Sequence, residues 1–173
     1  MRILLFCFAS LFFFQTPWEE NTNLEGRFQI IAPGKFEEKT DTLATGVGGL
    51  VYHTFFHQYI SENDENEVYM VSYCDYPEGL VFTYSIGLTE DFFQTTMQAA
   101  SESVKGEILY ETDIQLDEYP GKFWRIDYLD GGATIKTKAY LVKNRYYAVQ
   151  VIAFHKNSIN EITDRFFNSF KLL

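Results

Sequence analysis

Two histidines four residues apart, His53 and His57, have a spacing that could serve metal binding. On a helix this spacing would place both imidazoles on one face, where they could bind one ion. Their neighbours Tyr52 and Phe55, however, are residue types that favour a strand. Along a strand, four residues span roughly 13 Å, which is too far for two ligands of one ion. We therefore interpret both histidines as polar positions on one strand face, and His155 has no obvious partner.

The segment Ser61–Glu67, with the sequence SENDENE, offers the carboxylate and amide oxygens that Ca²⁺ prefers. It lacks both the ligand spacing and the glycine of an EF-hand loop. A solvated loop between two strands is therefore the favoured interpretation over a weak Ca²⁺ site.

The sequence carries no recognisable catalytic motif. It contains no Gly-x-Ser-x-Gly turn and no His-Glu-x-x-His pair, and its glycine-rich segment 46–49 precedes a strand pattern rather than a helix. Cys74 lies in an apolar strand pattern with no His or Lys beside it, so we interpret it as a small core residue rather than a reactive thiol. We expect no enzymatic activity, no catalytic residue, no bound metal and no cofactor.

The N-terminus has the layout of a secretory signal peptide, in which Arg2 precedes the apolar run Ile3–Phe14. At 1.5 Å per residue this run reaches only about 18 Å, short of the roughly 30 Å hydrocarbon core of a bilayer. We therefore expect a signal peptide at residues 1–16, cleaved somewhere between about Ala9 and Trp18. The protein would then be extracytoplasmic, either periplasmic or secreted, and an uncleaved leader would tether it to the membrane.

The remaining residues, 17–173, suit one domain with a substantial core and are too few for two. The formal net charge is −10 at pH 7. Nucleic acid and anionic lipid surfaces both require a basic patch, so this excess of acid argues against either as the partner. Cys74 is the single cysteine after the leader, which excludes an intramolecular disulfide. We expect a monomer with no membrane insertion of the mature domain.

Alternating and apolar runs separated by turn residues predict mainly strands. The expected strands are 27–32, 36–42, 50–60, 68–74, 108–116, 123–129, 134–142 and 146–154. Pro33-Gly34 is expected to turn the first strand back into the second, and the polar stretch 61–66 to join a hairpin. Further turns are expected at Tyr119-Pro120-Gly121 and at Lys143-Asn144, where the asparagine would adopt the left-handed conformation.

Two segments instead show the helical period. The first carries an apolar stripe, with Thr89 as its expected cap and Lys105-Gly106 as its end; the stripe is Phe93, Met97, Ala100 and Val104. The second is expected to begin with a capping box formed by Ser158 and Glu161. Its stripe is Ile159, Ile162, Phe166 and Phe170, of which the two phenylalanines are expected to lie buried against the sheet.

The strand Tyr146–Phe154 carries bulky residues at successive positions, so both of its faces should be covered. Many strands joined as hairpins, together with two separate helices, predict an α+β domain. We expect a largely antiparallel β-sheet flanked by helices.

Several segments resemble, in order, the PsbP-like domain family and its exported bacterial relatives. They are Trp18 with Glu25–Gly34, then Tyr69–Pro77, Tyr119–Phe123, Tyr140–Tyr147 and Phe166–Phe170. The resemblance implies that residues 17–173 form one PsbP-like α/β/α sandwich around an antiparallel sheet. In chloroplasts and cyanobacteria such domains are extrinsic, non-catalytic subunits that stabilise the oxygen-evolving site of photosystem II. We expect the fold to carry over and the photosynthetic role not to, because a fold does not fix a function.

Aromatic residues are abundant, with 17 Phe and 12 Tyr in the chain. Seven tyrosines fall in or beside strands, and a core position is favoured over a ligand site for most; they are Tyr69, Tyr73, Tyr76, Tyr128, Tyr140, Tyr146 and Tyr147. We expect a non-catalytic accessory protein that binds or stabilises another extracytoplasmic protein through a sheet edge or an aromatic patch. The alternative is a small-ligand carrier with an aromatic-lined pocket between helix and sheet.

Overall fold

The computed structural model describes residues 18–45, 48–59, 65–79 and 86–173, and the expected signal peptide lies outside them. The helices are α1 (Ile86–Val104) and α2 (Glu161–Ser169), and a 3₁₀ turn spans His155–Asn157. The strands are β1 (Glu19–Asn23), β2 (Phe28–Ala32), β3 (Glu37–Thr45), β4 (Gly48–Gln58), β5 (Val68–Asp75), β6 (Glu107–Leu116), β7 (Tyr119–Tyr128), β8 (Ala133–Val142), β9 (Arg145–Phe154) and β10 (Lys171–Leu172).

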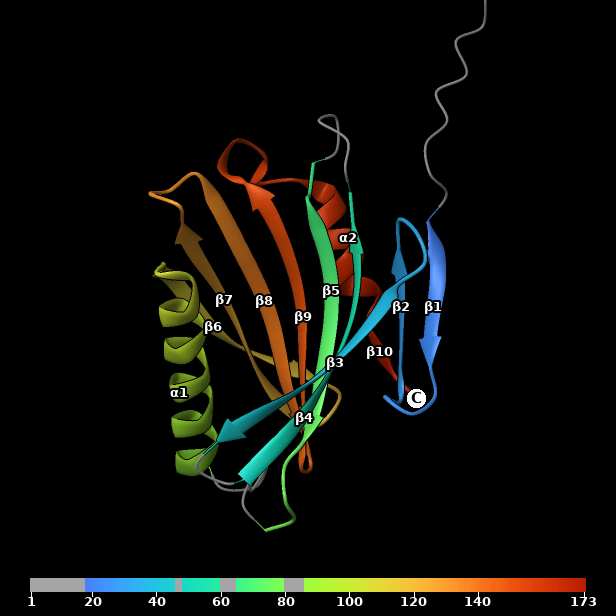
Figure 1. Cartoon of the computed structure of the whole chain (residues 1–173), viewed down its shortest axis with the longest axis vertical. Helices are drawn as coiled ribbons and strands as arrows, with labels where there is room; N and C mark the ends of the chain where they lie inside the picture. The colour runs from blue at the N-terminus through green and yellow to red at the C-terminus, as the bar shows by residue number, and fades with distance from the viewer. Residues whose placement is uncertain (1–17, 46–47, 60–64, 80–85) are drawn as a thin grey trace, which may run out of the picture.

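Seven strands form one sheet in the order β3-β4-β5-β9-β8-β7-β6, and every neighbouring pair is antiparallel. A second, three-stranded sheet has the order β1-β2-β10. Figure 1 shows α1 on one side of the large sheet and α2 with the small sheet on the other. The predicted α+β class, with a largely antiparallel sheet flanked by helices, is confirmed.

The expected hairpin across Pro33-Gly34 is wrong. Strand β2 pairs with β1 and β10, whereas β3 pairs with β4. The burial of the two strands gives the reason: β2 buries Phe28, Ile30 and Ala32 beneath the large sheet, while all nine residues of β3 are exposed. The turn therefore leads the chain out of one layer into another.

Three hairpins of the large sheet follow the sequence patterns closely. Strands β4 and β5 form the predicted pair around the polar stretch. Strands β8 and β9 join across Lys143-Asn144 as predicted, but Lys143, with φ of 59°, is the residue in the left-handed conformation. The turn between β6 and β7 comes earlier than predicted, because Asp117 takes the positive φ of 52° and Tyr119-Pro120-Gly121 already belongs to β7.

Helix α1 has the predicted apolar stripe, in which Phe93 and Met97 are buried. It begins at Ile86, so Thr89 lies inside the helix and is not its cap. Thr89 is itself buried and stands four residues before Phe93, which places it on the stripe. Lys105, with φ of 53°, ends the helix as predicted, and the Gly106 N–H donates to the Ser101 carbonyl at 2.9 Å.

Helix α2 starts differently from the prediction. Its N-cap is Asn160, whose side-chain oxygen accepts from the Thr163 N–H at 2.7 Å, and not the predicted Ser158. Ile159, expected in the apolar stripe, is 88% exposed. Phe166 and Phe170 are buried at 0% and 4% exposure, which confirms their expected place.

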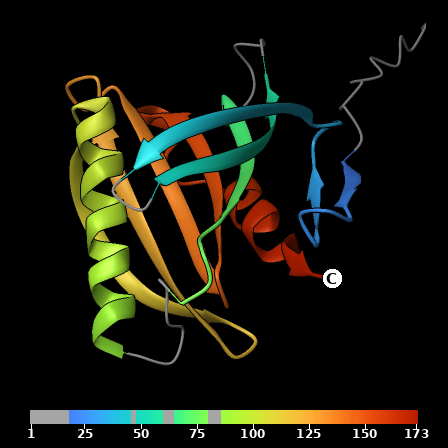
Figure 2. The ribbon, with the colours of Figure 1, turned by 60° about the horizontal axis from the view of Figure 1, so that its bottom comes forward.

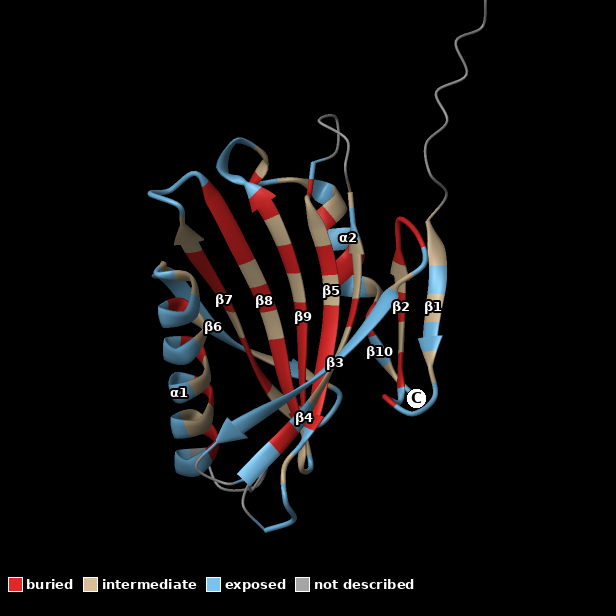
Figure 3. Cartoon of the chain, viewed as in Figure 1, coloured by how far each residue is buried: buried red, intermediate tan, exposed pale blue. Residues whose placement is uncertain are grey.

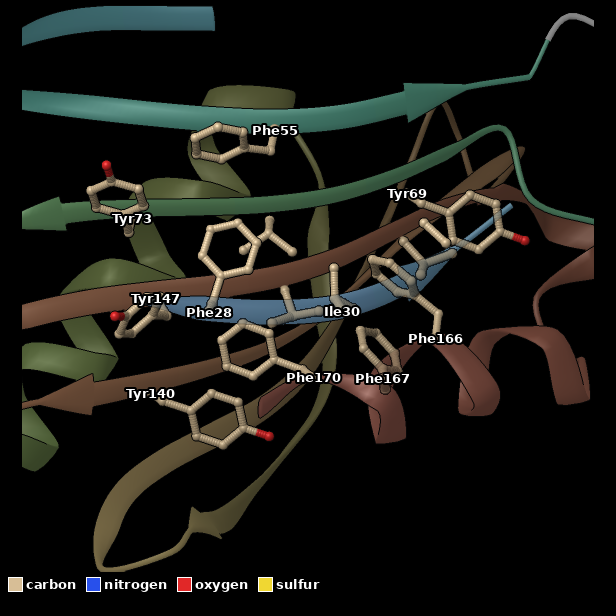
Figure 4. Close-up of a cluster of buried hydrophobic side chains, with 14 residues drawn as sticks. Phe28, Ile30, Phe55, Tyr69, Tyr73, Tyr140, Tyr147, Phe166, Phe167 and Phe170 are labelled. Atoms are coloured by element: carbon tan, nitrogen blue, oxygen red, sulfur yellow. The ribbon is translucent and has the colours of Figure 1, made fainter. Parts of the chain in front are cut away.

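Two apolar clusters lie on opposite faces of the large sheet. Figure 3 shows the buried residues concentrated along its central strands. One, between the sheet, α2 and β2, is rich in rings; Figure 4 shows Phe28, Ile30, Phe55, Tyr69, Tyr73, Tyr140, Tyr147, Phe166, Phe167 and Phe170. The other lies beneath α1 and includes Phe93, Met97 and Trp124. Strand β9 contributes to both, with Tyr147 and Val149 on one face and Tyr146 and Ala148 on the other, so its predicted double coverage is confirmed.

Candidate binding surfaces

His53 and His57 both lie on β4 and have separate surroundings. The His53 ring stacks on Tyr73 at 4.7 Å between centroids, and its Nδ1 lies 3.8 Å from Oε1 of Glu38. The His57 ring packs edge-on against Tyr59 and fills the space that a side chain at Gly34 would need. Each imidazole therefore helps to pack the junction between β4 and its neighbours.

His155 lies far from both, beyond the end of β9, with Nδ1 3.7 Å from Oδ2 of Asp127 on β7. In the part of the chain that the structure describes, no three His, Cys, Asp or Glu side chains are grouped so that they could hold a metal ion.

The acidic loop is described only from Glu65 onward. Glu65 is exposed, but Asn66 is completely buried, contrary to the solvated loop expected from the sequence. The Asn66 side chain donates to Tyr69 Oη at 2.8 Å and accepts from Asn160 Nδ2 at 3.0 Å and Thr163 Oγ1 at 3.2 Å. These bonds fasten the end of the loop to the first turn of α2, because Asn66 satisfies its amide entirely with protein groups.

Five of the seven strand-associated tyrosines are core residues, as favoured from the sequence: Tyr69, Tyr73, Tyr140, Tyr146 and Tyr147 are each 5% exposed or less. Cys74 is also fully buried, as expected, and burial raises its pKa to about 11 despite a hydrogen bond with Tyr52. A thiol with a raised pKa is a poor nucleophile near neutral pH, so this group belongs to the packing under α1.

Arg145 and Asp75 form a two-bond ion pair at the end of the β5–β9 ladder. Nε and Nη2 of Arg145 donate to the two Asp75 oxygens, each at 2.6 Å, and Nη1 donates to the Glu25 carbonyl at 2.7 Å. The guanidinium also lies over the Tyr73 ring, 4.5 Å from its centroid. The hydrogen bonds from Arg145 hold the pKa of Asp75 below its usual range.

A cavity of about 540 Å³ opens beside this pair, and its walls include Arg27, Tyr119 and Tyr147. It carries charges of both signs, and Arg145 already points its donors at Asp75 and at a backbone carbonyl. The Asp75–Arg145 pair therefore joins β5, β9 and the loop before β2 as a clasp, and three of the five guanidinium N–H groups are used in doing so.

A second ionic cluster surrounds Lys122 on the α1 side. Its Nζ lies 2.7 Å from Asp113, 2.9 Å from Glu90 and 3.6 Å from Glu111, although the side chain is only 6% exposed. Burial alone would lower the pKa of Lys122, but the hydrogen bonds to Asp113 and Glu90 outweigh it and the pKa is raised. The cluster ties the first turns of α1 to β6 and β7.

The two edge strands of the large sheet, β3 and β6, are both largely exposed (Figure 3). Strand β3 is exposed throughout and carries Glu37, Glu38, Lys39 and Asp41, and in Figure 2 its hairpin with β4 reaches out past β5 toward the α1 side. Charged residues on an edge discourage the addition of another strand. Strand β6 is exposed at seven of its ten residues.

Two large apolar side chains stand side by side on β6: Leu109 is 49% exposed and Tyr110 is 41% exposed. The ladder to β7 shifts register between Ile108 and Tyr110, which is a β-bulge. The Tyr110 ring packs on Phe123 of β7, 5.7 Å between centroids. Strand β6 therefore offers a sheet edge beside an aromatic patch formed by Tyr110 and Phe123.

Next to this patch, one face of β7 and β8 carries three cations, Arg125, Lys136 and Lys138, which we call the cationic face. The register places Tyr110, Arg125 and Lys136 in one row across three strands, and Thr112, Phe123 and Lys138 in the next. Residues directly paired in an antiparallel ladder share a face of the sheet. This face of the sheet is the one toward α2, because the rings of Phe123 and Phe167 lie 6.0 Å apart between centroids.

Neither the cationic face nor the ionic clusters were predicted from the sequence. The alternation of Lys136 and Lys138 with Ile135, Thr137 and Ala139 is visible in the sequence and would have indicated one polar face of β8. That Arg125 joins them depends on the β7–β8 register, which the sequence does not reveal.

No family model and no curated protein matches this sequence. Among solved structures, the chain is similar to the solution structure of cyanobacterial PsbP from Synechocystis sp. PCC 6803, with a TM-score of 0.61 and 10% sequence identity. The match covers 91% of this chain and 94% of that one. The protein therefore has a PsbP-like fold. None of the helices among the described residues has the length and apolar character needed to cross a membrane.

Proposed function

We propose that this protein is an exported, non-catalytic accessory protein that binds another extracytoplasmic protein through strand β6 and the aromatic patch beside it. The observation that carries the proposal is the pairing of an exposed edge with exposed apolar side chains: Leu109 and Tyr110 lie on a strand that ends the sheet. Such a strand presents backbone donors and acceptors together with apolar contacts.

The packing of both helices supports a protein partner over the alternative of a ligand carrier. Phe166 and Phe170 pack between α2 and the sheet, and Phe93 and Met97 pack beneath α1. A cavity of about 200 Å³ remains between the start of α1, β6 and β7, which is smaller than the roughly 300–1,000 Å³ of typical ligand pockets. A carrier of the kind considered from the sequence would need an aromatic-lined pocket at one of these two places. The cavity beside Arg145 lies elsewhere, and although Tyr119 and Tyr147 are in its walls, most of its lining residues are charged or polar.

Site-specific photo-crosslinking tests the proposed edge. A photoreactive phenylalanine analogue in place of Tyr110, in the protein produced by its own cells, should give a discrete adduct with another protein. The matched control is the same analogue at Thr40 on the opposite edge strand, which should give none. The proposal fails when Tyr110 gives no adduct, or when both positions give the same adducts.

The location is a separate part of the proposal, in which residues 1–16 are the signal peptide and 17–173 form one domain. Produced in a Gram-negative host, the full chain should be recovered outside the cytoplasm. A chain without residues 1–14 should stay inside and remain folded, because we assign the apolar run to export and not to the fold. An insoluble truncated chain combined with a soluble, cytoplasmic full chain would show that the run belongs to the fold.

A further inference from the structure

The cationic face is unusual in a protein with a formal net charge of −10. Its three cations occupy neighbouring positions, since Arg125 pairs directly with Lys136 and Phe123 with Lys138 in the β7–β8 ladder. Adjacent strands lie about 4.8 Å apart and alternate residues of one strand about 7 Å apart. The three cations therefore fall within one small area, with Tyr110 and Phe123 as apolar neighbours; Arg125 is 9% exposed, so Lys136 and Lys138 are the more accessible charges.

The partners of these cations within the protein are incomplete. Arg125 is paired with Asp127, from Nε to Oδ1 at 2.7 Å and from Nη2 to Oδ2 at 3.1 Å, and Asp127 is also approached by His155. Lys138 Nζ donates to Asn168 Oδ1 at 3.2 Å and lies 5.4 Å from the centroid of the Phe167 ring. Neither of these two contacts supplies a carboxylate to Lys138.

Lys136 makes no ion pair and no side-chain hydrogen bond with any of the residues that the structure describes. The carboxylate of Asp164 on α2 favours the charged forms of Lys136 and Lys138, but it forms no ion pair with either. The two lysines are thus half-buried cations without a direct anionic partner.

Their titration agrees with that geometry. Burial lowers the pKa of Lys136, and the neighbouring charge of Arg125 lowers it further. Burial likewise lowers the pKa of Lys138. A carboxylate placed over the two ammonium groups would supply the charge-assisted hydrogen bonds that they lack.

We propose that the cationic face receives a carboxylate-rich segment of the partner protein, laid over β7 and β8 beside the patch at Tyr110. This inference rests on the proposed function, because it assigns the chemistry of the partner to the same site. The apolar walls from Tyr110 and Phe123 suit a segment in which Glu or Asp alternates with other residues, since side chains of an extended chain alternate in direction.

A short acidic segment fits this face better than a membrane or a nucleic acid. Exposed charges interact over about 10 Å at ordinary ionic strength, so a short segment can place a few carboxylates over Lys136 and Lys138 without spanning the rest of the molecule. A continuous anionic surface would also meet the exposed Asp164 of α2, whose charge reaches both lysines, and the exposed Asp130 beyond the end of β7. Like charges there would oppose its approach.

Peptide binding to the purified full chain tests the inference. The probe is a fluorescein-labelled dodecapeptide in which Glu alternates with Thr, followed by fluorescence anisotropy at two salt concentrations, and its analogue carries Gln in place of Glu. We expect the Glu peptide to bind at least tenfold more tightly than the Gln peptide, and rising salt to weaken only the former.

Variants locate that binding. Lys136→Met/Lys138→Met should weaken binding of the Glu peptide at least tenfold, while Lys136→Arg/Lys138→Arg should keep it within about threefold. The control Lys35→Met/Lys171→Met removes the same charge from exposed lysines elsewhere and should leave binding within about twofold. Thermal unfolding of each variant verifies that it is folded.

Three outcomes would overturn the inference: equal binding of the Glu and Gln peptides, unchanged binding by Lys136→Met/Lys138→Met, or a loss in the control equal to the loss in that variant. Binding of phosphatidylglycerol vesicles that depends on Lys136 and Lys138, without binding of the Glu peptide, would also overturn it in favour of a lipid surface. An adduct at Tyr110 together with any of these results would leave the edge-binding proposal standing and remove only the acidic partner.

Discussion

Strands β7 and β8 present two contrasting faces, and the contrast shows which face of these strands is available for binding. Under α1 they bury Trp124, Ile126 and Ala139. On the other face the same strands carry Arg125, Lys136 and Lys138. Strand β9, two positions further into the sheet than β7, is apolar on both faces. The side chains of each strand are therefore apolar on a face that another layer covers and charged on a face that is less covered.

The extent of the covering layers accounts for the difference. A helix is about 10 Å wide with its side chains and so covers about two strands spaced 4.8 Å apart. Helix α1 packs on β6 and β7, whereas the nine-residue α2 packs on β9 and on β2 of the small sheet. On the α2 side of β7 and β8, Phe167 contacts Phe123, Asn168 accepts from Lys138, and Phe170 stacks on Tyr140. Beyond these contacts Lys136 and Lys138 stay only half-buried, and together with Arg125 they form the cationic face.

The largest expected effect concerns the covered side of the comparison. Phe166→Ala should destabilise the fold by roughly 3–5 kcal/mol, because the ring is fully buried and packs against Tyr69 at 5.1 Å. Ile159→Ala, seven residues earlier and 88% exposed, is the control and should change the free energy of unfolding by less than about 0.5 kcal/mol. Urea unfolding measures both, and equal losses would show that α2 does not pack as described.

A smaller loss is expected at the start of α2. Asn160→Ala should cost about 1–2 kcal/mol, because it removes the N-cap and also one partner of the buried Asn66 amide. Glu161→Ala, which would break the capping box expected from the sequence, should cost less than about 0.5 kcal/mol. A greater loss of stability from Glu161→Ala than from Asn160→Ala would show that the capping box forms in solution.

The α2 region also shows what the sequence could and could not predict. The stripe residues Phe166 and Phe170 were predicted correctly, because helical period and burial are properties of a short segment. The N-cap was not, because Ser158 and Asn160 are both good caps and the choice depends on Asn66, some ninety residues away in the chain.

Long-range pairing explains the other differences. Strand β2 reads as the first half of a hairpin, but its partners are β1 and the two-residue β10 at the opposite end of the chain, both too short or too polar to show in the sequence. Candidate binding surfaces likewise depend on which strands pair. Lys136 and Lys138 suggest a polar face by themselves, whereas their position beside Arg125 and Tyr110 exists only in the assembled sheet.

The clasp at the end of the β5–β9 ladder should give a modest, pH-dependent effect. The pKa of Asp75 is lower in the fold than in the unfolded chain, so its contribution is present above about pH 4 and is lost as the pH falls through the folded value. Asp75 is half exposed, which limits the contribution to about 1 kcal/mol or less.

Asp75→Asn should therefore lower the urea midpoint at pH 7 and have little effect near pH 2, where the wild-type carboxyl is protonated as well. Glu78→Gln, an exposed acid close by in the sequence, is the control and should change neither midpoint noticeably. An equal loss at both pH values would mean that the variant acts through packing and not through the ion pair with Arg145.

The smallest effect belongs to the open face and tests the comparison most directly. Lys136 has a lowered pKa in the fold, so its ammonium form is less favourable there than in the unfolded chain. The sign follows: near neutral pH the charged lysine detracts from stability, and this penalty is relieved as the pH rises through the folded pKa. Lys136→Met should consequently leave the free energy of unfolding within about 0.5 kcal/mol of the wild type at pH 7, or raise it slightly. The difference in free energy of unfolding between variant and wild type should then shift in favour of the wild type toward pH 10.

A clear loss of stability in Lys136→Met at pH 7, like that of a core residue, would mean that Lys136 stabilises the fold through a contact of its own. The face would then be part of the covered structure, and the distinction between the two sides of β7 and β8 would disappear.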